Sequence, residues 1–546
     1  MVNKVPTIVS YEQRGGTWVA SAFGFAAESA PANQRCAVFK MCLDEEPEET
    51  ASNPAFRPNW VSMQKTVVQV IKDFLDMLYN QMLSTLRTQG LGPENLDYNV
   101  LFTVPAQYEV LEVERFKSIV TSTGFGRHTV GVSLREPEAA ILYTINHGER
   151  FWMPENQCVI LCDAGGGTVD IASYKISQLH PQPKLEQVDI VSGGPWGSIK
   201  IDRNFRKWFY NTCIDAEWQS YFQSSPEGKT HMQRICQRFI AQKEVFDNSP
   251  WTDSITIELS PQNLSGPRII PGSGLIRISR AEMCTFFEDS VRGSIDCLDQ
   301  HVRRCLQEGH LIKSIFLVGG LGSSPYLLSR VKQYTTGLPS EIQVFSPINA
   351  EYAVIRGAIE SHQANLLGYE DQIAVKLCPA SYGIKASTLW DPARHRQGVD
   401  DQYLNPLTKN LMARNQVIWL IKKGEKITGK RLAELKEEFS RSFKKAPEAT
   451  WEDCIVMCSL DDPPPRITPA VKQVCLLKSD MAGLPKDLYK KEKSKERGAF
   501  FRRKRFYSCQ FDIIFNVGLT DIEIALWFQG KVRSDLLKVN WSELAA

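Results

Sequence analysis

Residues 158–176 read CVILCDAGGGTVDIASYKI, and this stretch decides the fold. An apolar strand runs into Asp163, three glycines and Thr168, and a second strand follows in which apolar residues alternate with polar ones. Glycines lack the Cβ atoms that hold a backbone away from an anion, Thr168 adds a hydroxyl, and Asp163 can hold the water shell of a metal ion. The stretch predicts a phosphate-binding loop between two strands, since a dinucleotide fold would place a helix after the glycines. The alternative is a glycine-rich turn that binds no ligand.

The composition indicates several structural units and no dominant charge. The 546 residues exceed the size of a single core, and domain sizes suggest about three or four units. There are 64 Lys and Arg residues against 62 Asp and Glu, so the net charge of +2 gives no sign of a nucleic-acid or membrane partner. The 14 cysteines are scattered and several lie in apolar runs, which indicates buried thiols in a reducing compartment.

The sequence disfavours a zinc site and also a membrane-spanning or targeting segment. Zinc binding at Cys454 and Cys458 lacks a matching second pair of ligands. No apolar run approaches the ~20 residues that span a bilayer, and the N-terminal residues lack the pattern of a targeting signal. We therefore expect a cytoplasmic protein without a membrane segment.

The first two thirds of the chain alternate strands with helices, which predicts an α/β architecture with sites at strand ends. We expect two strands within 6–25, on either side of a turn at 14–16, then a strand at 98–104 and another that ends near 134. Further strands are expected on both sides of the loop at 163–168, in short segments within 255–280, and at 313–318. The expected helices are 62–87, 109–121, 138–146, most of 205–246 with a turn at 224–229, 281–306, and 326–334 after a glycine turn at 319–322.

Beyond residue 369 strand patterns replace helices. Segments 416–421, 471–478, 508–515 and 522–528 have strand patterns, with Pro-rich and basic loops between them. We place a domain boundary at 367–372, giving domains 1–368 and 369–546. The basic stretch 490–505 alternates with glutamates and is interpreted as a loop, with a nucleic-acid patch as the alternative.

Four motifs in order carry a resemblance to a known family: FTVPA at 102–106, LREPEAA at 134–140, the loop at 163–170 and FLVGG at 316–320. They resemble the nucleotide-binding domain of the heat shock protein 70 chaperones. The stretch at 194–202 and the lack of a long helical lid resemble the divergent fungal and animal branch of that family. The resemblance covers about residues 1–365 and is weak beyond them.

The resemblance implies an α/β fold: the two-lobed nucleotide-binding domain of the actin-like ATPases, which are ribonuclease H-like, followed by a smaller β-rich domain. In that second domain, SYGI at 381–384 and WLIKKG at 419–424 resemble the opening strands of a peptide-binding sandwich. The implied cofactors are ATP or ADP and Mg²⁺, and the implied partners are unfolded or extended peptide and co-chaperones.

Carried over by position, the family pattern assigns a role to each of a set of residues. It gives the β- and γ-phosphate cradle to Gly165, Gly166, Gly167 and Thr168, the water shell of Mg²⁺ to Asp163, the second carboxylate to Glu136, the γ-phosphate lysine to Lys40, the ribose turn to Gly197 and Ser198, the adenosine lysine to Lys243, and the turn under the nucleoside to Gly319 and Gly320. Catalysis would then fall to Glu136, Asp163 and Lys40, which suits a reaction that depends on positioning and charge neutralisation.

Each assignment has a simpler alternative. Glu136 precedes a proline and could only cap a helix, and Lys40 could be a solvated surface lysine. Lys243 has acidic neighbours on its own helix and could form an ordinary surface ion pair with them. Gly319 and Gly320 could make a tight turn and nothing else.

Two departures from the family pattern limit the expected activity. Family members begin with an Asp-x-Gly-Thr-Thr loop, whereas this sequence opens at 5–11 with a segment that resembles the strand after it. Its loss would remove a carboxylate, half of the cradle and the central strands of the first sheet, and would cost more than the ~10²–10³ in rate typical of one lost donor. Ser323 stands where the chaperones have an arginine that stacks on adenine.

The sequence therefore predicts a heat shock protein 70-like ATP-binding protein with nucleotide-linked conformational change and chaperone-like ATP hydrolysis. Hydrolysis depends on whether a longer chain supplies the first phosphate loop. The alternative is a non-catalytic binding or scaffold protein, a degenerate ATPase that keeps the fold. A more distant alternative is a sugar kinase of the same superfamily, which the β-rich second domain argues against.

Overall fold

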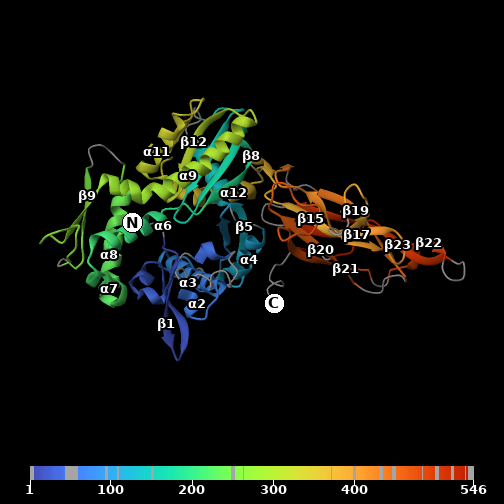
Figure 1. The fold of residues 1–546 in the computed structure, drawn as a ribbon, viewed down its shortest axis with the longest axis horizontal. Helices are drawn as coiled ribbons and strands as arrows, with labels where there is room; N and C mark the ends of the chain where they lie inside the picture. Colours follow the sequence, from blue (N-terminus) through green and yellow to red (C-terminus); the bar gives the residue numbers. More distant parts are fainter. Residues whose placement is uncertain are drawn as a thin grey trace. The chain divides into compact units, whose positions relative to one another are not determined.

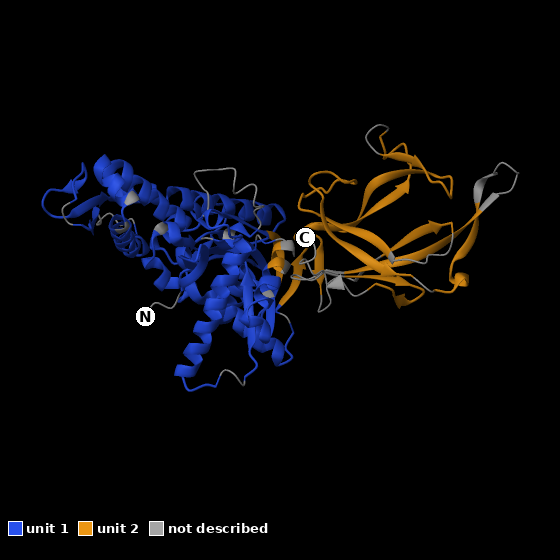
Figure 2. Cartoon of the chain, turned by 90° about the horizontal axis from the view of Figure 1, so that it is seen from below, with its two compact units in different colours: residues 1–108, 116–185, 191–372 blue, residues 109–115, 186–190, 373–546 orange. Residues whose placement is uncertain are grey.

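The computed structural model describes residues 5–37, 39–43, 59–92, 96–106, 108, 110–148, 153–247, 253–261, 264–370, 372–396, 401–428, 434–444, 450–481, 484–497, 503–517, 522–534 and 537–538. The chain forms two compact units (Figure 2). Unit 1 contains residues 1–108, 116–185 and 191–372, and unit 2 contains residues 109–115, 186–190 and 373–546. Among the described helices, none combines the length and the apolar character needed to cross a bilayer.

The glycine loop connects two inner strands of the main sheet of unit 1, of which β8 and β12 are labelled in Figure 1. β6 (Cys158–Ala164) and β7 (Val169–Gln178) are antiparallel, from Cys158↔Lys175 to Ala164↔Val169. On the other side of β6, β12 (Ile312–Val318) runs parallel to it, followed by β13 (Gln343–Phe345), while β8 (Lys184–Gly194) neighbours β7. Every residue of β6 is buried, as its continuous apolar run predicts. The predicted strand, loop and second strand are confirmed.

Long helices cover this sheet. α9 (Arg280–Gln307) packs against β6, β7 and β12, and it begins with a capping box between Ser279 and Glu282. His301 of α9 is fully buried and lies within hydrogen-bonding distance of Ser173 at 3.0 Å and Ser192 at 2.8 Å. α5 (Glu136–His147) packs against α12 (Ala353–Leu366) and against β6. The helices thereby hold the strand that leads into the glycine loop.

The N-terminal part of unit 1 contains two small sheets. β1 (Ile8–Arg14), β2 (Thr17–Phe23) and β3 (Arg35–Ala37) are antiparallel in the order β2-β1-β3, and β4 (Asn99–Val104) pairs in parallel with β5 (Thr129–Arg135). α3 (Val67–Thr88) begins five residues later than predicted. Gln64 has a left-handed φ of 57° that separates α3 from the short α2 (Asn59–Ser62), and Thr66 then caps α3 through the N–H of Gln69.

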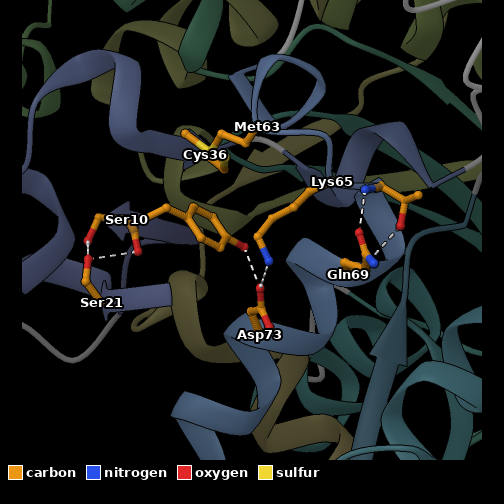
Figure 3. Close-up of polar contacts among 9 residues, drawn as sticks. Ser10, Ser21, Cys36, Met63, Lys65, Gln69 and Asp73 are labelled. Atoms are coloured by element: carbon orange, nitrogen blue, oxygen red, sulfur yellow. Dashed lines mark hydrogen bonds and ion pairs between the residues drawn. The ribbon is translucent and has the colours of Figure 1, made fainter. Parts of the chain in front are cut away.

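A polar network joins the first of these sheets to α3 (Figure 3). The Tyr11 hydroxyl of β1 donates to Asp73 Oδ2 at 2.8 Å, and Lys65 Nζ lies 3.1 Å from the same oxygen and 4.7 Å from the Tyr11 ring centre. Burial, and then Asp73, raise the pKa of Tyr11, so it remains a donor. Beside it, Cys36 of β3 contacts the Met63 sulfur at 4.0 Å. These contacts fix the strand that leads to Lys40.

Residues 199–245 form three helices and one π-helical turn. They are α6 (Ile199–Trp208), η8 (Phe209–Cys213), α7 (Ala216–Ser224) and α8 (Pro226–Val245). Phe205 of α6 stacks on Phe239 of α8 with ring centres 3.9 Å apart. The predicted turn at 224–229 is shorter than expected, because Ser225 caps α8 and Pro226 occupies its first turn. A three-stranded sheet follows, made of β9 (Ser254–Glu258), β10 (Ile269–Ile270) and β11 (Leu275–Ser279).

Unit 2 consists mainly of two antiparallel sheets that share a buried core. The first contains β16 (Gln402–Leu404), β17 (Leu411–Ile421), β15 (Ser381–Leu389), β20 (Thr450–Cys458) and β21 (Lys472–Asp480) in that order. The second contains β19 (Glu434–Phe443), β23 (Arg503–Val517), β24 (Ile522–Phe528) and β25 (Lys531–Val532), with β22 (Lys490–Arg497) and β26 (Leu537–Lys538) as further partners. A third pairing joins β14 (Ile373–Leu377) to β18 (Lys426–Thr428).

One prediction for unit 2 is wrong. Residues 490–497 and 503–505 of the basic stretch interpreted as a loop lie in paired strands, because β22 is antiparallel to β23 with Lys490 opposite Ser508 and Lys493 opposite Arg505. Residues 498–502 lie outside the described residues. Alternating charges on an exposed strand look like a solvated loop in the sequence, and only the pairing with an apolar strand distinguishes the two.

Candidate functional site

The glycine loop is bound to the start of α6 by its carbonyl groups. The carbonyls of Gly165, Gly166 and Gly167 accept hydrogen bonds from the backbone N–H groups at 197–199: Ser198 at 3.1 Å, Ile199 at 2.9 Å and Gly197 at 3.1 Å, respectively. The N–H of Gly165 donates to the carbonyl of Thr168 at 2.9 Å, which closes the turn. All three carbonyls therefore face the start of α6, which holds the loop in place.

Residues 165–168 of the same loop line a cavity. Within the part of the chain that the structure describes, no oxygen accepts from the N–H of Gly166, Gly167 or Thr168. These residues line a cavity of about 700 Å³. A Cβ added at Gly166 would meet nothing within 4 Å, so the space beside it is open. Successive N–H groups on such a concave turn can bind an anion by donating hydrogen bonds to it.

Two of the predicted site glycines lie so close to another backbone segment that there is no room for a side chain. A Cβ at Gly197 would lie 2.4 Å from the carbonyl oxygen of Gly166. A Cβ at Gly319 would lie 2.5 Å from the carbonyl oxygen of Ala164, and Gly319 also has a φ of +83°. The parallel pairing of β12 with β6 sets Val318 opposite Asp163 and so brings Gly319 to the loop.

The glycine turn at 319–322 differs from its prediction. Gly319 and Gly320 begin a four-residue helix, α10 (Gly319–Gly322), rather than a turn that leads directly into the next helix. That next helix, α11 (Pro325–Thr335), starts after Ser324, whose hydroxyl caps it. Ser323 lies between the two and donates its hydroxyl to the carbonyl of Gly319 at 3.0 Å.

Lys40 and Glu136 form an ion pair at the same cavity. Lys40 lies in η3 (Phe39–Cys42), its Nζ donates to Glu136 Oε1, and both residues line the cavity. Burial lowers the pKa of Lys40, but Glu136, and with smaller effect Asp163 and Asp170, outweigh it, so the pKa rises above its usual value of 10.5. The side chain is 48% exposed. The Tyr108 hydroxyl donates to the backbone carbonyl of Lys40 at 2.5 Å and holds this turn in place.

Glu136 does not make the capping contact of α5. The capping contact comes from Glu138, whose Oε2 accepts from the N–H of Arg135 at 3.3 Å. Arg135 is itself buried and donates to the carbonyl of Tyr108 at 3.0 Å. The first carboxylate of α5, that of Glu136, thus pairs with Lys40, and the second, that of Glu138, caps the helix.

Two further carboxylates flank the loop. Asp163 and Asp170 are opposite each other in the β6–β7 register, and both are buried. Asp170 is only 1% exposed, and its Oδ2 accepts from the Thr168 hydroxyl at 3.1 Å. The sequence interpretation gave no role to Asp170, although a charged residue at the first buried positions of a strand was the available signal.

Lys243 is paired with a residue that the sequence interpretation left out. Its Nζ lies 2.6 Å from Oδ1 of Asp202 in α6, and Lys243 is 8% exposed. Burial raises the pKa of Asp202, and Lys243 and then Arg206 offset only part of that effect. The alternative of an ion pair with acidic neighbours on its own helix does not describe this contact. Asp202, Arg203 and Arg206 line the cavity one helical turn or more beyond the glycine loop.

A family profile described as a domain of unknown function (DUF8568) matches residues 377–543. Parts of the chain are also similar to curated proteins. The human protein Heat shock 70 kDa protein 12A is 24% identical over 266 residues, which cover 44% of this chain and 36% of that protein. The chain is a distant relative of the heat shock protein 70 family.

Two more relatives support this relationship. Human Heat shock 70 kDa protein 12B is 22% identical over 255 residues, covering 43% of this chain and 35% of that protein. Chaperone protein HscA of Buchnera aphidicola is 25% identical over 337 residues, covering 60% of this chain and 54% of HscA. The matches thus span about a third to a half of the length of these heat shock protein 70 relatives. The mixed α/β architecture of several sheets fits that relationship.

Proposed function

We propose that unit 1 binds ATP or ADP together with Mg²⁺ at the cavity beside the glycine loop. The observation that carries the proposal is the set of N–H groups at 166–168, which open onto a cavity that Lys40 and Glu136 also line. A volume of about 700 Å³ lies within the range of sites for ligands of nucleotide size. The distant heat shock protein 70 relatives support the same ligand class.

The donors and acceptors at the cavity fit a nucleotide with its metal. Backbone N–H groups suit phosphate oxygens, and Lys40 adds a fixed positive charge. Glu136 lines the cavity, and Asp163 lies at the end of β6 that leads into the loop. Both are carboxylates of the kind that accept hydrogen bonds from the water shell of Mg²⁺. When bound, Mg²⁺ would neutralise charge on the phosphates. The chain's own residues would hold, orient and partly enclose the phosphate end of the ligand.

The adenosine end would lie toward α6 and the turns of Gly197 and Gly319. Asp202 and Arg203 line the cavity on that side. Lys243 reaches this region through its ion pair with Asp202 and would contact the ligand only if that pair opened. We infer from this pair that nucleotide binding displaces α6 and α8 relative to each other, which is the proposed nucleotide-linked conformational change.

Hydrolysis is the further step of the proposal. Glu136 would orient a water molecule toward the terminal phosphate, since its carboxylate is directed into the cavity rather than at its own helix. In the non-catalytic alternative the same residues would bind the nucleotide without turning it over. Release of inorganic phosphate from ATP under single-turnover conditions separates the two, with Glu136→Gln as the control for contaminating ATPases.

Nucleotide binding is tested by titrating the full chain with MgADP and MgATP in a calorimeter and by measuring the midpoint of thermal unfolding. The variant Gly166→Ala adds a methyl group in open space, so it should fold normally and weaken binding by about 10-fold or more because the methyl group blocks the N–H groups. Gly92→Ala is the matched control, because Gly92 is exposed, has equally open space and lies outside the cavity.

The outcomes are distinct. Binding by the wild type and the control, but not by Gly166→Ala, supports the site. The proposal is contradicted if the wild type shows no heat of binding and no rise in unfolding temperature with either nucleotide. Equal binding by all three proteins places the nucleotide elsewhere.

A further inference from the structure

Unit 1 has a second cavity, with a volume of about 390 Å³. Its walls come from the start of β1, the 3-10 helix η1 (Gly24–Ser29), β3, α6, η8, α7 and one side of α8. It shares Ile8 and Arg206 with the cavity beside the glycine loop, and its other lining residues differ from those of that cavity. No residue to which the sequence patterns assign a role lines it.

Three cations line this second cavity against one carboxylate. The cations are those of Arg35, Arg206 and Lys229, and the carboxylate is that of Glu28. Arg35 is half-buried, and burial, and then the charge of Arg206, lower its pKa. The two guanidinium groups are therefore close enough to repel each other. Two positive charges remain in excess at the cavity.

The contacts of the two arginines are with neutral groups. Arg35 Nη1 donates to the backbone carbonyl of Glu28 at 2.9 Å and to the side-chain oxygen of Gln233 at 3.5 Å. Arg206 Nη2 lies 3.6 Å from Cys236 Sγ. Burial raises the pKa of Cys236 by more than Arg206 lowers it, so the sulfur is a neutral thiol. None of these contacts supplies a negative charge.

A carboxylate close to Arg206 in the sequence is occupied elsewhere. Asp202 lies one turn before Arg206 in α6, and it pairs with Lys243 at 2.6 Å. Among the residues that the structure describes, neither Arg35 nor Arg206 forms an ion pair with a carboxylate. Two neighbouring guanidinium groups without a counterion favour the binding of an anion from solution.

A cavity of unit 2 provides a comparison. It lies beside β15 and β17, has a volume of about 820 Å³ and is also lined by arginines. Two of these, Arg396 and Arg466, already have partners. Its guanidinium groups are therefore less available to an anion than those of Arg35 and Arg206.

The rest of the second cavity of unit 1 is partly apolar. Four apolar side chains line it, namely Ile8, Phe222, Met232 and Ile240. Phe222 and Met232 are buried, and the Phe222 ring packs edge-to-face on that of Phe209 with centres 5.6 Å apart. The backbone of Arg35 is held as well, because its carbonyl accepts from Asn59 Nδ2 at 2.6 Å. The charged and apolar walls thus both start from fixed elements.

We propose that this cavity binds a small phosphate monoester that carries an apolar group. The charge of about −2 on such a phosphate matches the two excess positive charges. Arg35 and Arg206 would donate to the phosphate oxygens, and the apolar group would lie on Phe222 and Met232. A carboxylate with the same apolar group would leave one positive charge uncompensated and should bind more weakly. The volume is within the range of small-ligand sites.

The direct test uses the full chain without nucleotide and titrates it with phenyl phosphate at about pH 8, where the phosphate is a dianion. Calorimetry and the midpoint of thermal unfolding are the two measurements. Inorganic phosphate supplies the charge without the apolar group, and benzoate supplies the apolar group with a single charge. We expect phenyl phosphate to bind about 10-fold or more tightly than either. The proposal is overturned if phenyl phosphate gives neither heat nor a rise in unfolding temperature, or if either comparison compound binds as tightly.

Variants then locate the site. Arg35→Gln should weaken phenyl phosphate binding by about 10-fold or more, because a charge-assisted hydrogen bond is lost. Arg234→Gln, an exposed arginine of α8 that does not line the cavity, is the matched control and should bind as the wild type does. Circular dichroism spectra check that both variants fold. Lys229→Gln is a second variant on another wall and should weaken binding by about 3-fold. Undiminished binding by both Arg35→Gln and Lys229→Gln would overturn the proposal.

Gly166→Ala separates this site from the cavity beside the glycine loop. Gly166 lines only the latter, so this variant should bind phenyl phosphate as the wild type does. Loss of phenyl phosphate binding in Gly166→Ala, with no change in Arg35→Gln, would place the compound beside the glycine loop. That outcome overturns the present proposal and leaves the proposed nucleotide binding intact.

Discussion

In unit 1 the cavity beside the glycine loop offers backbone N–H groups at 166–168, whereas in unit 2 the cavity beside β15 offers guanidinium groups at the ends of long side chains. The first set of donors is fixed by three hydrogen bonds to α6, and the second includes Arg394, which is largely exposed. A backbone site is therefore damaged by adding atoms, and a side-chain site by removing them. The backbone donors of unit 1 should therefore select a ligand more closely by its shape than the side-chain donors of unit 2.

The largest effect that separates the two sites should come from Gly197→Ala. The added Cβ would lie 2.4 Å from the carbonyl oxygen of Gly166, so the loop must move. We expect MgADP affinity to fall by about 100-fold, a loss typical of misplacing a binding group by roughly 1 Å, and the free energy of unfolding to fall by about 1–3 kcal/mol. Calorimetry and urea unfolding measure the two effects. Undiminished nucleotide affinity would mean that the loop does not bind the ligand.

An intermediate effect should come from the pair formed by Lys40 and Glu136. Lys40→Ala removes the cation among the carboxylates and should weaken MgATP binding by about 10-fold, because the phosphates then face uncompensated negative charge. A double-mutant cycle with Glu136→Gln should give a coupling of only about 0.5–1 kcal/mol in the free energy of unfolding, since the lysine is half exposed. Additive effects in that cycle would show that the pair is not formed in solution.

The smallest effect should be the pH dependence of the same lysine. Folding raises the pKa of Lys40 above its usual value of 10.5, so its contribution to stability is fully present below that value and is lost only as pH rises through the raised pKa. The difference in free energy of unfolding between wild type and Lys40→Met should thus stay constant from pH 7 to pH 9.5. A steady decline of that difference between pH 7 and pH 9 would contradict the carboxylate environment of Lys40.

Local features of the molecule were predictable from the sequence. The loop and strands at 158–178 follow from a continuous apolar run, three glycines and an alternating run, all of which act within a few residues. Lys40 was identified by its position alone, and the structure brings it to Glu136, 96 residues away. The sequence left open whether Glu136 only caps α5, because it does not say whether Glu136 or Glu138 turns back to the helix start; in the structure the capping contact comes from Glu138.

Features that depend on distant pairing were not predictable. The partner of Lys243 is Asp202 on another helix, and the closeness of Gly319 to Ala164 depends on β12 pairing with β6. The cavity of unit 2 needs Arg466 to lie beside β17, about 70 residues from the basic run at 394–396. That run was a visible signal, but without its opposite wall it could not be distinguished from an exposed loop.

The three hydrogen bonds from the start of α6 to the glycine loop have a consequence for how this protein can be observed. The amide protons of Gly197, Ser198 and Ile199 are held by the carbonyls of the loop itself. Their rates of hydrogen–deuterium exchange therefore report directly on whether the loop is in place, with no label, ligand or assay of turnover. Mass spectrometry of a single peptide that spans residues 195–205 can measure these exchange rates.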